Sequence, residues 1–487
     1  MKKPNIILIM TDQQRWDTIN SNGFKHMITP NLDNLSKGGI TFTSCFAAGS
    51  TCISSRAAMF TGMYPHNTGV YSFNRWAHQN IWVRDLGKNG YYTANIGKMH
   101  LSPMYADDVF HERFVVENKC QEFEKFGLKP DKWSEYLNSK GISRPVERRY
   151  KYPGWKQMLN SVVWEYDEED HIDSFVGNKA VDWINNYNGK EPFFLQIGFP
   201  GPHEPYDPPE RFLKMYDNKN IPAPVMQDGE LNNKPPEHIG HQKRFSQMKN
   251  DSVIDMYNAD ISDITKMRKH YYANITLIDE KIGGILKALE KRGFLKNSIV
   301  IFTSDHGDSL GDHKLPYKWL MYDSMIRVPL IIKDFRKNRN NRIKRTDKLI
   351  SLMNIGPTIL SYAGVKIPSY IEAEPINEYL DNGSTKNLPE YVFTEDNYIV
   401  MIRSEKYKLV YYISQEYGEL YDMKKDPYEL KNLWNIKKYS KIKEELKETL
   451  LNWIAESSYF NGAYKHSKSV YYSVRWPDHK RKIYNLI

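Results

Sequence analysis

Three short apolar runs stand out along the chain, and each ends in polar residues. They span residues 5–10 (NIILIM), 193–199 (FFLQIGF) and 298–304 (SIVIFTS). Continuous apolar runs of this length are typical of strands that are buried on both faces of a parallel sheet. The residues that follow them are Thr11-Asp12, Pro200 to His203, and Asp305-His306. Because ligands gather at the carboxyl ends of parallel strands, the pattern predicts a polar site at one sheet edge.

Helical periodicity fills the sequence between these strands. It covers Asn31 to Gly38, Ile172 to Tyr187, and Asn274 to Arg292, where Gly293 ends the last helix. Strands that alternate with helices predict an α/β fold with a large mixed, mostly parallel sheet sandwiched by helices. Residues 101–165 and 205–265 are poorer in periodicity, and we interpret them as long insertions over the site.

The spacing of the apolar runs changes after about residue 385. Short apolar runs at 391–393, 398–403 and 408–413 are followed by the turn 425–427 and a helical pattern from about 437 to 456. We therefore expect a catalytic α/β domain over residues 1–385. Residues 386–487 would form a C-terminal subdomain with a small antiparallel sheet and a helix.

Charge and composition exclude several classes of protein. The chain has 487 residues, an ordinary globular composition and a net charge of +9 spread along its length. No nucleic-acid recognition motif accompanies this charge, and the run Lys333 to Arg345 is interpreted as a polar loop between strands. The sequence contains no apolar stretch long enough to span a membrane. Nucleic-acid and membrane partners are therefore not expected.

The cysteines favour a reducing compartment. Cys45, Cys52 and Cys120 are few and odd in number, which argues against a disulfide framework. The apolar run after Met1-Lys2-Lys3-Pro4 is too short for a signal peptide. We therefore expect a cytoplasmic protein.

A metal site is predicted where the strands end. Asp12 and Asp305-His306 are far apart in sequence but would converge at one sheet edge. Their hard oxygen ligands suit Ca²⁺ or Mg²⁺ better than Zn²⁺. The alternative for Asp12 alone is a helix N-cap.

Cys52 begins a helix-forming segment, Gly49 to Gly62 (GSTCISSRAAMFTG), with Arg56 four residues after it. On its own, a lone cysteine is more often a small buried hydrophobic residue. The free amides of a helix start and the nearby cation favour an anion site instead. The whole segment, with Met63 to His66 after it, resembles the signature of the sulfatase family.

That resemblance implies a formylglycine made from Cys52 by a maturation enzyme. Its hydrated aldehyde would offer two hydroxyls, one that attacks sulfur and one that expels sulfate by collapse to the aldehyde. Ser54 stands where the family has Pro or Ala, which puts recognition by the maturation enzyme in doubt. Gln13 stands where the family often has a second Asp, so this ligand is an amide oxygen or is missing. The implied metal set is Asp12, Gln13, Cys52 as formylglycine, Asp305 and His306, with Ca²⁺ preferred to Mg²⁺.

Four further residues match family motifs in order and context. The resemblance implies that Lys98 and Lys318 hold sulfate oxygens, that His100 contacts the second hydroxyl or acts as a base, and that His203 protonates the leaving oxygen. The alternatives are exposed charges for the lysines and structural hydrogen bonds for the histidines. We expect a structural role for His313.

Other functions in different classes stay open. One is a phosphate or phosphonate monoester hydrolase of the same alkaline phosphatase-like superfamily, against which Lys98-x-His100 argues. Another is a non-catalytic protein that binds sulfated ligands with unconverted Cys52. A small sulfated substrate is expected. The aromatic segments 71–82 and 150–164 would line a pocket or pack in the core, and the last twenty residues could dock on a second subunit.

Overall fold

In the computed structural model of this protein, the core is built on alternating faces of buried strands. It describes residues 2–71, 74–118, 129–142, 144–145, 152–250, 252–337 and 344–461. Ile6, Leu8 and Met10 of the first strand face one apolar cluster, whereas Ile7 and Ile9 face another. This period-two alternation explains why the run is apolar throughout, because both faces of the strand are covered.

The described residues form a large sheet of nine strands. In spatial order they are β4 (Glu112–Val115), β3 (Tyr92–Gly97), β5 (Phe193–Pro202), β1 (Asn5–Asp12), β6 (Ser298–Ser304), β7 (Arg327–Asp334), β2 (Ile40–Phe46) and β8 (Arg345–Thr346), with β9 (Ile350–Ser351) also paired to β2. β7 runs antiparallel to both its neighbours, and the other pairings are parallel. β1 therefore lies between β5 and β6, and these three strands end at the same edge.

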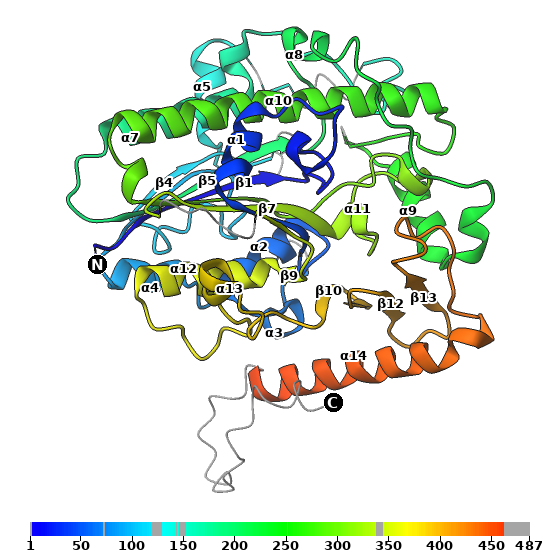
Figure 1. Ribbon diagram of the computed structural model, residues 1–487. Coiled ribbons are helices and arrows are strands. Elements are labelled where there is room, and N and C mark those ends of the chain that lie inside the picture. Colours follow the sequence, from blue (N-terminus) through cyan, green and yellow to red (C-terminus); the bar gives the residue numbers. More distant parts are fainter. Residues whose placement is uncertain are drawn as a thin grey trace, which may run out of the picture.

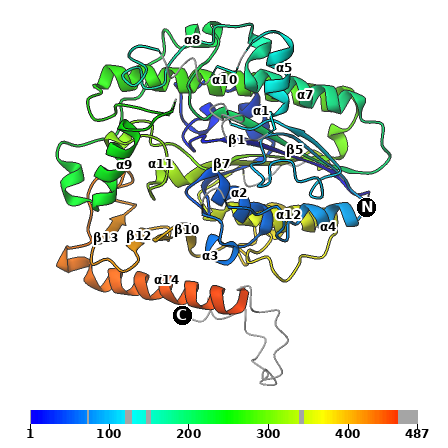
Figure 2. The same cartoon turned by 180° about the vertical axis from the view of Figure 1, so that it is seen from behind.

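Helices cover both faces of this sheet (Figure 1; Figure 2 from behind). One face carries α1 (Pro30–Gly38), α7 (Ile172–Asn186) and α10 (Ile261–Lys291); the other carries α2 (Cys52–Thr61), α4 (Val83–Lys88), α12 (Ile355–Ala363) and α13 (Asn377–Asn382). The other α-helices before the C-terminal sheet are α3 (Pro65–Thr68), α5 (Lys132–Ser139), α8 (Glu210–Lys214), α9 (Pro236–Ser246) and α11 (Asp323–Ile326) among the described residues. The predicted fold class, a mostly parallel sheet sandwiched by helices, is confirmed.

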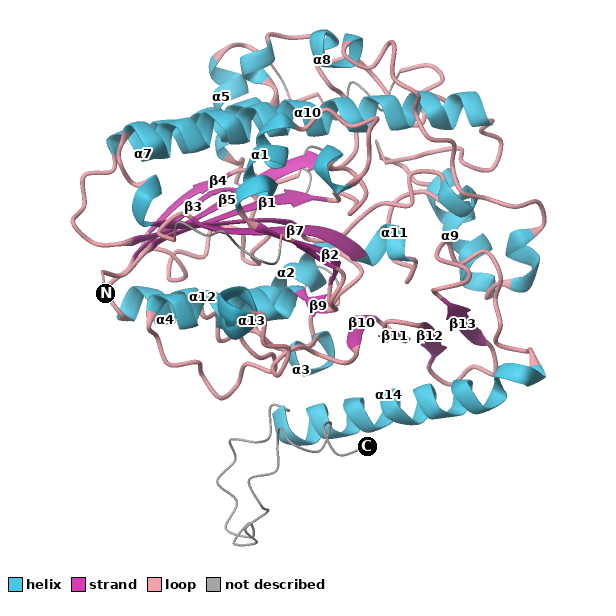
Figure 3. Ribbon diagram, in the orientation of Figure 1, coloured by secondary structure: helices cyan, strands magenta, loops and turns pink. Residues whose placement is uncertain are grey.

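A second, antiparallel sheet follows near the C-terminus (Figure 3). It consists of β10 (Val392–Asp396), β11 (Ile399–Arg403), β12 (Tyr407–Tyr412) and β13 (Gly418–Asp422), and α14 (Ser440–Asn461) packs against it. The amide of Glu395 donates to the carbonyl of Ala48, 2.9 Å away, so β10 joins the segment that leads to Cys52. The predicted small sheet with a helix is present, and the domain boundary at residue 385 stays a prediction.

Some predicted bounds were wrong. α10 begins at Ile261, well before Asn274, because Asp260 and Asp263 form a reciprocal capping box at its start. β13 was not predicted, because only two of its five residues are hydrophobic and they are adjacent. Cys120 and the last twenty residues lie outside the described part of the chain. Within the described residues, no helix has the length and hydropathy to cross a membrane.

The described tryptophans of the two aromatic segments belong to the core. Trp76 and Trp82 are fully buried, and Trp155 and Trp164 are nearly so. The indole N–H of Trp76 donates to the carbonyl of His100 at 2.9 Å, which anchors the loop after β3. The two alternatives for these segments were to line a pocket or to pack in the core, and these tryptophans pack in the core.

Candidate active site

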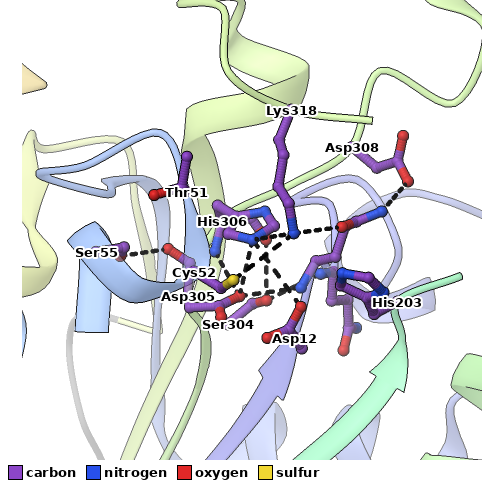
Figure 4. A network of polar contacts seen from close by, with 12 residues as sticks. Asp12, Thr51, Cys52, Ser55, His203, Ser304, Asp305, His306, Asp308 and Lys318 are labelled. Atoms are coloured by element: carbon purple, nitrogen blue, oxygen red, sulfur yellow. Dashed lines mark hydrogen bonds and ion pairs between the residues drawn. The ribbon is translucent and has the colours of Figure 1, made fainter. Parts of the chain in front are cut away.

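The carboxyl ends of β1, β5 and β6 bring the predicted site residues together. Asp12 ends β1, His203 follows β5, and Asp305 and His306 follow β6. Cys52 lies across from them at the first position of α2, where Thr51 is the N-cap and its side chain accepts from the Ser54 amide at 3.4 Å. Figure 4 shows these side chains converging around the cysteine sulfur.

Arg56 is fully buried between two acids. Its Nε lies 2.7 Å from Asp305 Oδ2, its Nη2 lies 3.2 Å from Asp12 Oδ2, and its Nη1 donates to the carbonyl of Lys98 at 3.0 Å. Removing one partner of a buried ion pair typically costs about 3–5 kcal/mol. The guanidinium of this α2 residue therefore fixes the positions of both carboxylates.

Lys98 and Lys318 are buried, so the alternative that they are exposed surface charges is wrong. Lys98 Nζ lies 2.5 Å from Asp12 Oδ2 and also donates to Asn118 Oδ1. Its backbone is held where β3 meets β5, since a Cβ on Gly198 would lie 1.9 Å from the Lys98 carbonyl oxygen. Only glycine permits this approach.

Lys318 faces several of the predicted metal ligands. Its Nζ lies 2.9 Å from Gln13 Oε1, 3.2 Å from His306 Nε2 and 3.9 Å from Cys52 Sγ. Its positive charge therefore lies against acceptors that could also bind a cation (Figure 4).

The electrostatics of the site favour anions at Cys52 and Asp12. Burial alone would raise the pKa of Asp12, but the charges of Lys98 and Lys318 outweigh it and hold this pKa well below its usual range. Burial also acts to raise the pKa of the Cys52 thiol, and the same two lysines lower it below its ordinary value. An oxygen nucleophile or a sulfate at this place would meet the same positive field.

Three candidate metal ligands lie close together. Ligand atoms of Asp12, Cys52 and His306 all lie within 4.8 Å of one another. Asp12 Oδ1 is buried and has no hydrogen-bond partner among the described residues. The Nδ1 of His306 is 2.8 Å from the Gly307 carbonyl, which only accepts, so in the neutral ring Nε2 is the acceptor, and it faces Lys318 Nζ at 3.2 Å. Asp12 ends a strand and caps no helix, so the N-cap alternative is wrong.

The two remaining histidines flank this centre. Burial and then Lys98 lower the pKa of His100 to about 3, while burial and then Lys318 hold the pKa of His203 well below its usual range. His100 has a left-handed backbone (φ 63°), and its amide donates to Glu117 Oε1 at 3.1 Å. His203 Nδ1 lies 2.9 Å from the carbonyl oxygen of Glu204.

Several contact residues of the site were not predicted. Glu117 and Asn118 hold the loop after β3, and Glu204 and Asp308 contact Gln13. The only signal in the sequence was their position just beyond apolar runs or motif residues. His313, predicted to be structural, stacks on Tyr322 with ring centroids 3.8 Å apart and pairs with Glu230 at 2.6 Å.

Comparison with protein-family models decides the family. The sulfatase family model matches residues 4–365, most of the chain. The chain belongs to the sulfatase family. A second model, N-sulphoglucosamine sulphohydrolase, C-terminal, matches residues 311–456 of this sulfatase, including its second sheet.

Individual relatives agree with this family. An arylsulfatase of Clostridium perfringens is 31% identical over 482 residues, covering 94% of this sulfatase and 96% of the relative. Among solved structures, the phosphonate monoester hydrolase of Agrobacterium radiobacter has a TM-score of 0.80 at 22% identity and covers 93% and 96% of the two chains. A protein in complex with its substrate D-glucosamine-2-N,6-O-disulfate has a TM-score of 0.71 at 22% identity, covering 96% and 100%. The two structural likenesses support the fold.

Proposed function

We propose that this sulfatase hydrolyses a small sulfated substrate with a formylglycine derived from Cys52 and one divalent cation. The observation that carries the proposal is the buried cluster in which Cys52 Sγ, the Asp12 and His306 ligand atoms and Lys318 Nζ lie within a few ångströms of one another. Family membership supports the same chemistry. The hydrated aldehyde would supply the attacking hydroxyl and the hydroxyl that releases sulfate.

The proposed cation ligands are Asp12, Gln13, Asp305, His306 and the modified Cys52. The unpartnered Asp12 Oδ1 and the oriented His306 Nε2 fit this role. Oxygen donors dominate the set, so we propose Ca²⁺, with Mg²⁺ as the second candidate. When bound, the cation would orient the nucleophile, lower its pKa and neutralise a sulfate oxygen.

The basic residues divide into two proposed roles. Arg56 holds Asp12 and Asp305 in place, as its contacts indicate. Lys98 and Lys318 would donate to the sulfate oxygens, where charge shifts as the ester bond breaks. Both ammonium groups have acidic or polar partners now, so a bound sulfate would compete for their hydrogen bonds.

The histidines would move protons. Because the carbonyl of Glu204 only accepts, His203 Nδ1 carries a proton, and Nε2 is the atom that would serve the leaving oxygen. The negative charge of a sulfate ester would raise the low pKa of His203 and favour its protonation. His100 is neutral at physiological pH, as its pKa of about 3 requires, which suits a base in sulfate release.

The second candidate function is a phosphate or phosphonate monoester hydrolase. Its support is the likeness in fold to a phosphonate monoester hydrolase. The ratio of kcat/KM on an aryl sulfate to that on an aryl phosphonate and an aryl phosphate tests the choice. We expect the sulfate to be preferred, and a wide preference for either phosphorus ester would reject the sulfatase assignment.

The nucleophile has its own test. The mass of the peptide that contains Cys52, from protein made with a formylglycine-generating enzyme, should show thiol replaced by aldehyde. Cys52→Ala should abolish hydrolysis and leave the unfolding temperature close to that of the wild type. An unmodified thiol without activity would favour the non-catalytic sulfate binder.

The remaining proposals concern partners and location. A maturation enzyme must accept Ser54 at the third position of the signature, a side chain that is buried in the folded protein. Cys45 and Cys52 are both free and buried, which supports a cytoplasmic location. Self-association stays a prediction, and sedimentation velocity would test it.

A further inference from the structure

The side-chain amide of Gln13 is held from both ends by charged groups. Its Nε2 donates to Glu204 Oε2 at 3.0 Å and to Asp308 Oδ2 at 2.7 Å, and its Oε1 accepts from Lys318 Nζ at 2.9 Å. All four side chains are buried. Because carboxylates only accept, the NH₂ group must face them, and a rotated amide would set its oxygen against two negative groups.

The backbone of Gln13 is fixed as well. Its φ of 67° lies in the left-handed region, which costs energy for a residue with a Cβ. Its amide donates to Asp305 Oδ1 at 3.0 Å, and its carbonyl accepts from the Tyr271 hydroxyl at 2.7 Å. The side chain therefore starts from a defined place and has one acceptable orientation.

The two carboxylates are themselves anchored. Asp308 Oδ2 also accepts from the Tyr206 hydroxyl, and Asp308 Oδ1 accepts from the Leu310 amide, each at 2.7 Å. Glu204 Oε2 lies 3.1 Å from Nδ1 of His203. Both acids thus contact the nitrogen end of the Gln13 amide, whereas Lys318 contacts its oxygen end.

We propose that Glu204 and Asp308 are positioning residues that point Gln13 Oε1 toward the cation. This inference rests on the proposed metal site. Two carboxylates at the nitrogen end also polarise the amide and make its oxygen a better ligand. The neutral glutamine would thereby serve where a second aspartate is common in the family.

Asp308→Asn tests the orientation. Every neighbour of the Asp308 oxygens is a donor, so one of them would face the NH₂ of the new side chain. If the NH₂ faces Gln13, only Glu204 still accepts from the Gln13 NH₂, so the amide is no longer held in one orientation and its oxygen is less often directed at the cation. We expect Ca²⁺ affinity, measured by calorimetry on the full chain without substrate, to fall about 10–100-fold. Glu204→Gln, which keeps an acceptor for Gln13, should change affinity much less than Glu204→Met.

A double variant separates orientation from stability. In Asp308→Asn with Gln13→Glu, one carboxylate oxygen accepts from the new amide and the other faces the cation, so affinity should return at least to the wild-type value. A double variant as weak as the single one, or single variants that bind like the wild type, would overturn the inference. A wild-type chain that binds neither Ca²⁺ nor Mg²⁺ would overturn the proposed metal site as well, so the two failures are distinguishable.

Discussion

At the scale of single residues, the site holds opposite charges in direct contact, and the side chains that carry them are buried. Lys318 illustrates the consequence, since its ammonium group touches Gln13 and His306, which are proposed cation ligands. Two positive charges cannot share these acceptors. A bound cation would displace Lys318 from these acceptors, which agrees with its proposed role as a donor to the sulfate.

Lys318→Met should therefore separate two properties. Loss of a charged donor to the sulfate should lower kcat/KM on an aryl sulfate about 10²–10³-fold. Ca²⁺ affinity, measured by calorimetry, should stay the same or become tighter, because a competing positive charge is removed. Lys314→Met, on the same loop but away from these ligands, should change neither value. Weaker Ca²⁺ binding by Lys318→Met would contradict the assigned role.

Residues with a motif could be predicted, and residues defined only by contact could not. Cys52, Arg56, Lys98 and Lys318 stand in recognisable segments, and the structure brings them together. Glu204 and Asp308 contact Gln13 across 191 and 295 positions of sequence. Those contacts depend on the turns after β5 and β6, which no local periodicity describes.

At the scale of elements, α10 holds α1 through one carboxylate. Asp279 accepts from the backbone amides of Asn31 at 3.0 Å and Leu32 at 2.8 Å, in the first turn of α1. These are amides that a helix leaves unpaired. Burial nevertheless raises the pKa of Asp279 to about 6, even though these hydrogen bonds lower it.

This pKa predicts a pH-dependent contribution to stability. An acid whose pKa is raised in the folded state binds its proton more tightly there, so its contribution is complete below about pH 4 and is lost as pH rises through about 6. Between pH 4.5 and 7, wild type should lose about 2 kcal/mol of unfolding free energy relative to Asp279→Asn. Urea unfolding of both proteins across this range measures it. Glu280→Gln, an exposed neighbour, is the control, and an equal effect there would contradict the prediction.

The strands and helices themselves were partly predictable. β1, β5 and β6 are continuous apolar runs, and their polar ends predicted that they share one sheet edge, whereas their order in the sheet was not predicted. The early start of α10 was not predictable from apolar spacing, because its first turns carry Asp263, Lys266 and other polar residues. There the capping box and tertiary packing decide, and periodicity does not.

At the scale of the whole molecule, a buried ion cluster joins the two sheets. Lys408 of β12 is fully buried, 2.9 Å from Asp323 Oδ1 and 2.6 Å from Glu429 Oε1. Asp323 begins α11, only a few residues after Lys318, and its amide donates to Glu429 Oε2 at 2.7 Å. The C-terminal sheet therefore directly contacts α11, which follows the loop that carries Lys318.

Lys408→Met should leave Glu429 buried without its cation, and Asp323 would keep only the more distant Arg327 (3.7 Å) and Arg403 (4.0 Å). We expect a loss of about 3–5 kcal/mol of unfolding free energy and reduced hydrolysis of an aryl sulfate. Lys406→Met, an exposed lysine two residues away, should change stability by less than about 0.5 kcal/mol. Chemical unfolding followed by circular dichroism compares the two. Similar unfolding midpoints for both variants would show that the cluster does not support the fold.

The burial of α2 limits the time during which Cys52 can be modified. Every residue from Cys52 to Thr61 is buried in the folded chain, so the proposed maturation enzyme would have to reach Cys52 before this segment folds. Glu429, which completes the ion cluster, follows Cys52 by 377 residues. At roughly 5–20 residues per second, the ribosome needs about 20–75 s to make that stretch. Conversion of Cys52 would thus compete in time with synthesis and folding of the rest of the chain.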